Sequence, residues 1–117
     1  MKNKPSIVLN EPAFYVLLAL SKENLSGYEL TRVIFEITKG RLEVKTGIMY
    51  PMLKKLDDLR LIKLLDEEQG RNKKIYILTK EGHKVLNEEI QRIQEKVDEI
   101  NIYMNTEREA NHDEKIK

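Results

Sequence analysis

The sequence predicts a mainly α fold of the α+β class, in which four helices are accompanied by a few short strands. Two observations support this prediction. Apolar residues recur at helical spacing in four segments, and two short β-rich runs lie between residues 61 and 78. Charged residues make up 35% of the chain and hydrophobic residues 40%, which is typical of a helical protein with a modest core. The 117 residues leave room for one compact domain and one additional element.

The first two helices are expected between residues 10 and 40, after a flexible N-terminal arm at 1–9 that has no periodicity. Asn10 is suited to cap the first helix, and the continuous apolar run at 13–20 indicates that this helix is buried. Ser26 and Glu29 have the spacing of a capping box at the start of the second helix, which Gly40 ends. Its buried face is expected to contain Leu30, Val33, Ile34 and Ile37.

Residues 41–44 alternate and predict one small strand, and a third helix follows from about Thr46 to Leu59. Pro51 conflicts with this helix, because an interior proline costs about 3 kcal/mol, but only a few helical residues precede it. The inward face of the helix contains Met49, Met52, Leu53 and Leu56. The opposite stripe, at spacings of three and four residues, contains Thr46, Gly47, Tyr50, Pro51 and Lys54.

Two β-rich runs at 61–66 and 73–78 predict a hairpin, and Thr79 is placed to cap a fourth helix at 80–105. Apolar residues in that helix follow a heptad spacing, which predicts a dimerisation helix. They are Leu86, Ile90, Ile93, Val97, Ile100 and Met104. The alternative is that this stripe packs back on the first helix of its own chain. Residues 106–117 are charged and aperiodic and are expected to form a disordered tail.

This order of elements is that of a winged helix-turn-helix domain over residues 10–79, followed by a long C-terminal dimerisation helix. In such a domain the third helix enters the major groove of DNA and the hairpin lies along the backbone. Residues 39–80 hold eleven basic and six acidic side chains, a net charge of +5, although segregation by chance is an alternative. The basic side chains of the hairpin, which a merely solvated hairpin could also carry, are Arg71, Lys73 and Lys74.

The outward stripe of the third helix offers a hydroxyl at Thr46, a phenol at Tyr50 and an ammonium group at Lys54. Such groups usually position a protein on the DNA backbone rather than read bases. No Arg, Asn or Gln lies between Lys45 and Asp58, so the usual bidentate base contacts are missing from this helix. Sequence selection is therefore expected from Lys45, from thymine methyl groups or from DNA shape, and largely from the spacing that the long helix imposes on two copies.

Three blocks of the sequence resemble the signature blocks of PadR-like transcriptional regulators. They are Gly27-Tyr28-Glu29-Leu30, then residues 47–56 (GIMYPMLKKL), and Gly70-Arg71 together with residues 74–82 (KIYILTKEG). The blocks stand in the order and spacing of that family, and the resemblance covers about residues 10–104. With a single C-terminal helix, the chain resembles the short branch of the family. Proline is usual in the family at the position of Pro51, which removes the conflict in the third helix.

The resemblance implies a homodimeric repressor that binds a double-stranded DNA operator. It implies that Tyr28, Tyr50 and Lys54 lie near DNA phosphates and that Arg71 and Lys74 form the wing contact. It also implies that the last helix packs near the partner's first helix. That arrangement adds three interface residues, Phe14, Tyr15 and Leu18. Some relatives bind flat aromatic drugs between the subunits. A small hydrophobic ligand at the dimer interface is therefore left open, although the chain has no tryptophan to stack on it.

Two positions depart from the family pattern, and both concern the ends of the third helix. Arg60 stands where the family has glycine, so a left-handed cap at this position is expected to be strained or absent. Lys45 stands where a capping hydroxyl is common, and Thr46 is expected to substitute for it. These departures concern the limits of the recognition helix and not its existence.

Other classes of protein are disfavoured by the sequence. The chain has no cysteine, which excludes disulfides and thiolate metal sites and agrees with a cytoplasmic location. No nucleophile stands beside a base, and neither a metal nor a cofactor site is expected, so an enzyme is disfavoured. The longest apolar run is too short to cross a membrane. The remaining alternative is a winged-helix dimer that binds a protein instead of DNA.

Overall fold

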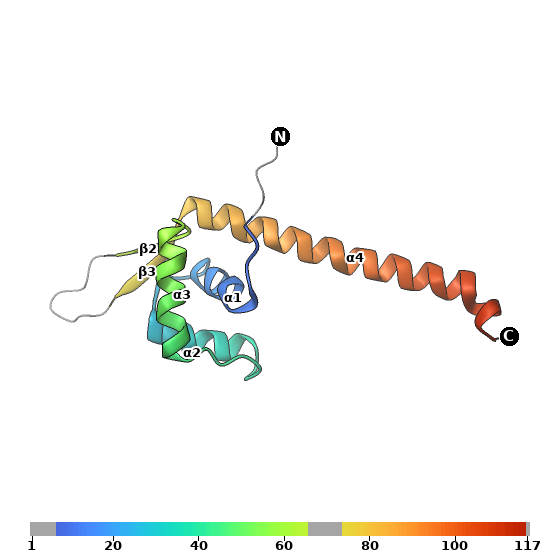
Figure 1. The fold of residues 1–117 in the computed structure, drawn as a ribbon, viewed down its shortest axis with the longest axis horizontal. Coiled ribbons are helices and arrows are strands. Elements are labelled where there is room, and N and C mark those ends of the chain that lie inside the picture. The colour runs from blue at the N-terminus through green and yellow to red at the C-terminus, as the bar shows by residue number, and fades with distance from the viewer. Residues whose placement is uncertain (1–6, 66–73, 117) are drawn as a thin grey trace. The chain divides into compact units, whose positions relative to one another are not determined.

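The computed structural model describes residues 7–65 and 74–116, and the side chains of residues 7–65 and 74–106. The chain forms two compact units, Met1–Asn87 and Glu88–Lys117. The first unit contains α1 (Glu11–Leu20), β1 (Leu25–Ser26), α2 (Gly27–Ile37), α3 (Thr46–Asp58), β2 (Ile62–Leu64), β3 (Ile75–Leu78) and the first turns of α4 (Lys80–Ile116) (Figure 1). The second unit consists of the remainder of α4. The predicted class, mainly helical with a small antiparallel sheet, is confirmed.

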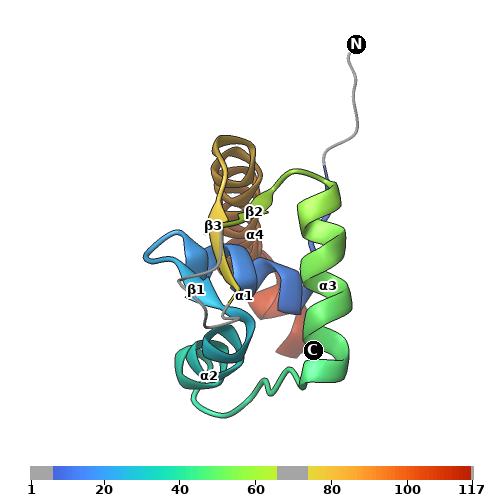
Figure 2. The ribbon, with the colours of Figure 1, turned by 90° about the vertical axis from the view of Figure 1, so that its left-hand side faces the viewer.

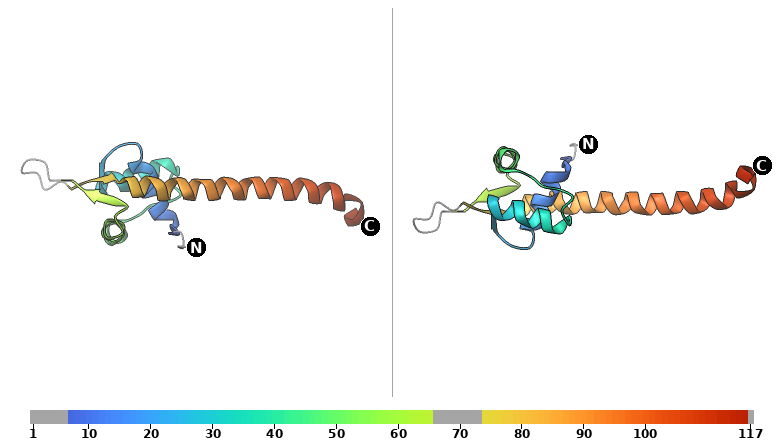
Figure 3. Two further views of the ribbon diagram at one scale, coloured as in Figure 1. Left: turned by 90° about the horizontal axis from the view of Figure 1, so that it is seen from above. Right: turned by 90° about the horizontal axis from the view of Figure 1, so that it is seen from below.

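A three-stranded antiparallel sheet in the order β1-β3-β2 forms one side of the first unit. Leu64 of β2 and Leu25 of β1 both pair with Tyr76, which makes β3 the central strand. The predicted hairpin of β2 and β3 is therefore confirmed, and α3 lies beside it in both views of Figure 3. The hairpin loop at 66–73 lies outside the described residues.

The predicted strand at 41–44 is wrong, because this segment joins no β-ladder. The second edge of β3 is occupied instead by Leu25 and Ser26, which precede α2. The segment is held in another way: the hydroxyl of Thr31 donates a hydrogen bond to the carbonyl oxygen of Val44 at 3.0 Å. Val44 is buried, so the alternation in the sequence reflects one inward side chain in a loop.

The core of the first unit lies where α1, α2, α3 and the sheet meet. Figure 2 shows α1 in the middle, with α2 below it and α3 to its right. This position explains why the apolar run of α1 covers nearly its whole circumference. The largest fully buried side chains of the unit are Val16, Leu17, Leu30, Ile34, Met49, Leu53, Leu61 and Ile62. Leu9 is also buried, so the end of the segment expected as a flexible arm packs on the domain; residues 1–6 lie outside the described residues.

The predicted starts of α1 and α2 are confirmed. Asn10 Oδ1 accepts a hydrogen bond from the backbone amide of Ala13 at 2.9 Å. At α2 the amide of Ser26 donates to Glu29 Oε1 at 2.9 Å, and the amide of Glu29 donates to Ser26 Oγ at 3.1 Å. Two amides that a helix start leaves without a partner are thereby satisfied. The prediction that Ile37 belongs to the buried face of α2 is wrong. Its side chain is 42% exposed, because it lies in the last turn of the helix.

The ends of α3 rest on less favourable local structure. Lys45 is the N-cap residue, and no side chain makes a capping hydrogen bond, so the prediction that Thr46 substitutes is wrong. The hydroxyl of Thr46 belongs to a residue already inside the helix, whereas a cap needs the residue before it. Pro51 lies inside the helix without ending it. At the other end Arg60 has φ 65°, so the left-handed cap is present. It is strained, because Arg60 has a Cβ atom, and this is one of the two outcomes expected from the sequence.

The first turn of α4 is joined closely to the end of α3. The amide of Gly82 donates to Thr79 Oγ1 at 2.9 Å, which confirms Thr79 as the cap, and the Thr79 hydroxyl lies 2.7 Å from the carbonyl oxygen of Arg60. A side chain at Gly82 would overlap the carbonyl oxygen of Leu61 and approach Leu78 Cδ1 to 2.6 Å. Glycine is therefore required here by space.

Two features of α4 differ from expectation. Leu86 is only 3% exposed and belongs to the core of the first unit, so the apolar stripe available to a partner starts at Ile90. The helix also continues past Asn105 to Ile116, because no glycine or proline follows Gly82 to stop it. Within the residues that the structure describes, no helix is both long and apolar enough to span a membrane.

Candidate nucleic-acid interface

The outward face of α3 is a continuous exposed stripe. Lys45, Thr46, Tyr50 and Lys54 are all exposed, while Met49 and Leu53 on the opposite face are fully buried. The predicted division of this helix into an inward and an outward face is confirmed, except that Met52 is only half-buried. The packing of Met49 and Leu53 therefore presents a phenol, a hydroxyl and two ammonium groups to the outside.

One of these ammonium groups has a partner within the helix. Lys54 Nζ lies 3.7 Å from Asp58 Oδ2, one turn further along α3, and both side chains are more than 60% exposed. An exposed pair of this kind contributes little to stability. The Lys54 side chain is therefore free to exchange Asp58 for another anion at small cost.

The sheet brings a second element to the same region. Ser26 of β1 pairs with Ile75 of β3 in antiparallel register, so the residue before Ile75 and the residues after Ser26 leave the sheet at the same end. Lys74 and Tyr28 are those residues, and both are exposed, Tyr28 to 71%. The start of α2 therefore lies beside the start of β3, where the chain returns from the loop of the hairpin, or wing, formed by β2 and β3.

Tyr50 connects α3 to this meeting point. Its ring lies against Gly27, the first residue of α2, and it remains 46% exposed. Three segments far apart in the sequence thus bring residues with polar side chains to the same end of the sheet, namely Tyr28, Tyr50 and Lys74. Sequence reasoning missed the strand that creates this cluster, because two residues are too few to show an alternating pattern.

Tyr76 forms part of the wall behind this cluster. It is 8% exposed, and burial raises the pKa of its phenol, with smaller contributions in the same direction from Tyr50 and Asp57. Its phenol therefore stays protonated at neutral pH. It is too buried to serve as a contact residue.

The two remaining wing residues of the prediction, Arg71 and Lys73, lie outside the described residues. Lys74 is the one predicted wing cation for which the structure gives a position, immediately before β3. The wing contact of Arg71 and Lys73 therefore stays a prediction.

The residues predicted for dimerisation fall on two surfaces, each described within its own unit. On α4 the exposed fractions are 40% for Ile93, 48% for Val97, 58% for Ile100 and 55% for Met104, while Ile90 is half-buried. On α1 Phe14, Tyr15 and Leu18 are half-buried. The rings of Phe14 and Tyr15 meet edge to face at 5.1 Å, and Arg41 donates to the Tyr15 hydroxyl at 3.3 Å.

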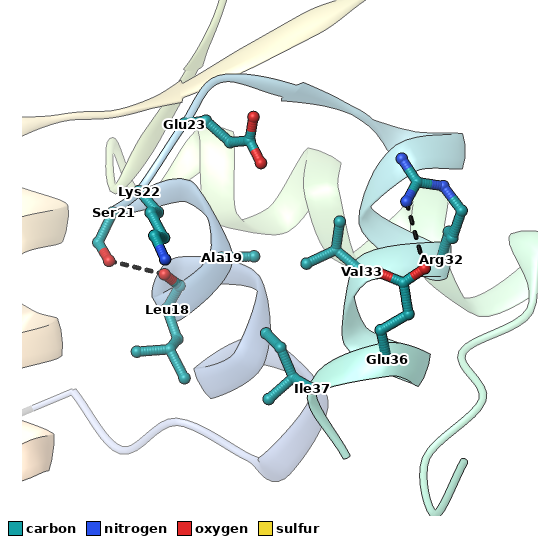
Figure 4. Close-up of a pocket in the computed structure, with 9 residues that line it drawn as sticks. All are labelled: Leu18, Ala19, Ser21, Lys22, Glu23, Arg32, Val33, Glu36 and Ile37. Carbon is teal, nitrogen blue, oxygen red and sulfur yellow. Dashed lines mark hydrogen bonds and ion pairs between the residues drawn. The ribbon is translucent and has the colours of Figure 1, made fainter. Parts of the chain in front are cut away.

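A groove of about 530 Å³ lies between α1 and α2 in the first unit. Figure 4 shows Val33 and Ile37 of α2 pointing toward α1, and Leu18 of α1 also lines the groove. Its rim is charged and includes the ion pair of Arg32 and Glu36, whose atoms are 3.4 Å apart. A groove of this volume is within the range of small-molecule sites.

The fold and the exposed stripe of α3 define a winged helix-turn-helix protein. The model of the Transcriptional regulator PadR-like family matches residues 16–88. The chain belongs to this family, whose members are transcriptional regulators and not enzymes.

Similar proteins are consistent with this assignment. Transcriptional regulator YqjI of Escherichia coli is 34% identical over 85 residues, which are 70% of this chain and 40% of that protein. This chain therefore spans two fifths of the length of that relative. Bacillus subtilis PadR in complex with operator DNA is 34% identical with a TM-score of 0.59, over 66% of this chain and 45% of that one. A PadR family transcription regulator from Clostridium difficile is 26% identical with a TM-score of 0.64, over 78% and 97% of the two chains.

Proposed function

We propose that this chain is a homodimeric repressor that binds a double-stranded DNA operator in the cytoplasm. The observation that carries the proposal is that the exposed residues Tyr28, Tyr50 and Lys74, far apart in the sequence, lie at the same end of the sheet, where Tyr50 belongs to the exposed stripe of α3. Phenols and ammonium groups are suited to DNA phosphates. The Bacillus subtilis relative in complex with operator DNA supports the same function.

Binding to a fluorescently labelled fragment from upstream of the gene tests the DNA contact. The dissociation constant should rise steeply between about 50 and 200 mM salt, because phosphate contacts release counterions. The double variant Arg71→Ala, Lys74→Ala should bind less tightly and with a smaller salt slope, by about 0.9 for each phosphate that is no longer neutralised. Lys84→Ala removes an exposed charge on the first turns of α4 and should leave both quantities unchanged.

A chain that shows no affinity for this DNA at low salt, yet is dimeric, would contradict the proposal. That outcome would favour the alternative of a winged-helix dimer that binds a protein. The exposed cluster at Tyr28, Tyr50 and Lys74 would then be its first candidate surface.

The proposed dimer rests on the apolar stripe of α4, from Ile90 to Met104. Burying one large aliphatic side chain contributes about 1.5–3 kcal/mol, so a partly exposed stripe at heptad spacing favours a partner helix. Ile93→Glu should yield monomers in sedimentation equilibrium and also weaken DNA binding. Gln91→Glu adds the same charge off the stripe and should remain dimeric; an Ile93→Glu variant that is still a dimer would refute the role of the stripe.

We also propose that a small hydrophobic inducer binds at the dimer interface and releases the repressor from DNA. The supporting observation is that Leu18, one of the interface residues on α1, also lines the groove between α1 and α2. An apolar ligand there would change the surface offered to a partner. Titration of the DNA complex with a planar aromatic dye should lower its anisotropy, and Val33→Glu should abolish that response if the groove is the site.

A further inference from the structure

Gly27 is the first residue of α2, and it is buried beneath the ring of Tyr50. A Cβ atom built on Gly27 would lie 2.8 Å from Cε1 and 3.1 Å from the hydroxyl oxygen of Tyr50. Real Cβ atoms essentially never approach another atom to less than 3.0 Å. The ring therefore occupies space that any other residue at position 27 would fill.

Backbone conformation does not explain this glycine. Among the described glycines, only Gly40 has a positive φ, so Gly27 adopts a conformation open to any residue. Alanine is moreover the better residue inside a helix. The absence of a side chain at position 27 is therefore explained by the ring that lies on it.

The two partners of this contact differ in how easily they can move. Gly27 is fixed by the capping box and by the pairing of its neighbour Ser26 with Ile75. Tyr50 is 46% exposed, so its ring can rotate into solvent. A methyl group at position 27 should displace the ring and leave both helices in place.

We propose that Gly27 is a positioning residue for DNA binding, which holds the phenol of Tyr50 against the start of α2 by leaving room for its ring. The expected effect of Gly27 on DNA affinity rests on the proposed function. Its expected effect on the position of the Tyr50 ring does not. The ligand that the phenol would meet is a phosphate of the DNA backbone, to which a hydroxyl donates a charge-assisted hydrogen bond.

The test combines Gly27→Ala, Tyr50→Ala and the double variant. Each single variant should weaken DNA binding about tenfold, the order expected for removing a hydrogen bond to a charged group. The double variant should bind no more weakly than Tyr50→Ala alone, because residues that act through one contact are not additive. Wild-type affinity in Gly27→Ala would overturn the proposal, and so would a loss of affinity that adds fully to that of Tyr50→Ala.

The position of the ring is measured without DNA, by NMR of tyrosine labelled with ¹³C at Cε. The Tyr50 resonance, identified by its loss in Tyr50→Ala, should shift in Gly27→Ala. It should stay in place in Gly47→Ala, since a Cβ on Gly47 has no atom within 4 Å. An unshifted resonance in Gly27→Ala overturns the positioning role whether or not the chain binds DNA. If the Tyr50 resonance shifts in Gly27→Ala but the wild-type protein does not bind DNA, the role in DNA binding is overturned and the positioning of the ring is not.

Protein stability provides the remaining check. If Gly27→Ala lowers the melting temperature, the double variant should recover the value of Tyr50→Ala, because it has no ring to clash with the methyl group. A double variant that does not recover would mean that alanine disturbs α2 itself, and would also overturn the proposal.

Discussion

The helices α2 and α3 pack against each other, but they are held in place by different means. The start of α2 carries a complete capping box between Ser26 and Glu29. α3 starts at Lys45 without a side-chain cap, contains Pro51 and ends at a strained Arg60. The contrast teaches that the recognition helix depends on its buried face, whereas α2 also carries its own end signal. Four substitutions break or sharpen this comparison.

The largest effect is expected in the buried face of α3. Leu53 is fully buried, and Leu53→Ala should lower the free energy of unfolding by about 2–5 kcal/mol, because it buries less apolar surface and leaves a cavity. Urea denaturation followed by circular dichroism measures this change. Lys55→Ala, on the exposed side of the same helix, should change stability by less than about 0.5 kcal/mol. Equal effects of the two substitutions would contradict a helix held by its core face.

The capping box of α2 should give the next largest effect. Ser26→Ala removes the acceptor for the Glu29 amide and should cost about 1 kcal/mol. For a domain of this size the melting temperature should fall by about 4–8 °C. Ser21→Ala is the control, because the exposed Ser21 hydroxyl donates to the carbonyl of Leu18 at the end of α1 and caps no helix start. If both serines can be replaced without a change in melting temperature, α2 does not depend on its cap.

The strained end of α3 should respond in the opposite direction. Arg60→Gly relieves a positive φ that costs about 1–2 kcal/mol in a residue with a Cβ atom, less about 0.5–1 kcal/mol for the greater freedom of glycine in the unfolded chain. The protein should therefore gain between about 0 and 1.5 kcal/mol. Arg60→Ala keeps the strain and should show no such gain in thermal melting; a gain of the same size there would trace the effect to the removed charge.

The smallest stability effect is expected at the start of α3. Lys45→Ser supplies the missing cap and should add about 0.5 kcal/mol, while removal of a predicted DNA contact should reduce the salt slope of binding by about 0.9. Lys45→Ala should remove the same DNA contact without the stability gain. Thermal melting and anisotropy on the same samples separate the two effects. A serine variant that keeps full DNA affinity would remove Lys45 from the interface.

Most of the fold could be predicted from the sequence where long periodic segments specified it. The inward side chains of α3, the capping residues of α1 and α2, and the hairpin all follow from local patterns. The strand at Leu25–Ser26 could not be found in this way, because its pairing with β3 depends on residues about fifty positions later. The same limitation produced the false strand at 41–44, where the alternation was real but the edge of the sheet was already occupied.

The candidate interface was predictable as a set of residues and not as an arrangement. Tyr28 was included only through the family resemblance, since nothing in its own neighbourhood distinguishes it from a solvated residue. The position of Tyr28 at the same end of the sheet as Lys74 follows from the register of β1 and β3. The position of the Tyr50 ring depends on the absence of a side chain at Gly27. Leu86 was wrongly predicted as an interface residue. The heptad spacing of α4 includes both Leu86, which belongs to the core, and the exposed residues that follow it, so spacing alone does not show where the core ends.

The close approach of Gly82 to the Leu61 carbonyl has a mechanical consequence. The first turn of α4 packs directly on the backbone that follows α3, so no side chain fits between them. In the proposed dimer, one residue inserted or removed beyond Asn87 would turn the rest of α4 by about 100° and shift it by about 1.5 Å, without altering any predicted DNA contact. We therefore expect half-site spacing and phosphate contacts to be adjustable by mutation independently of each other.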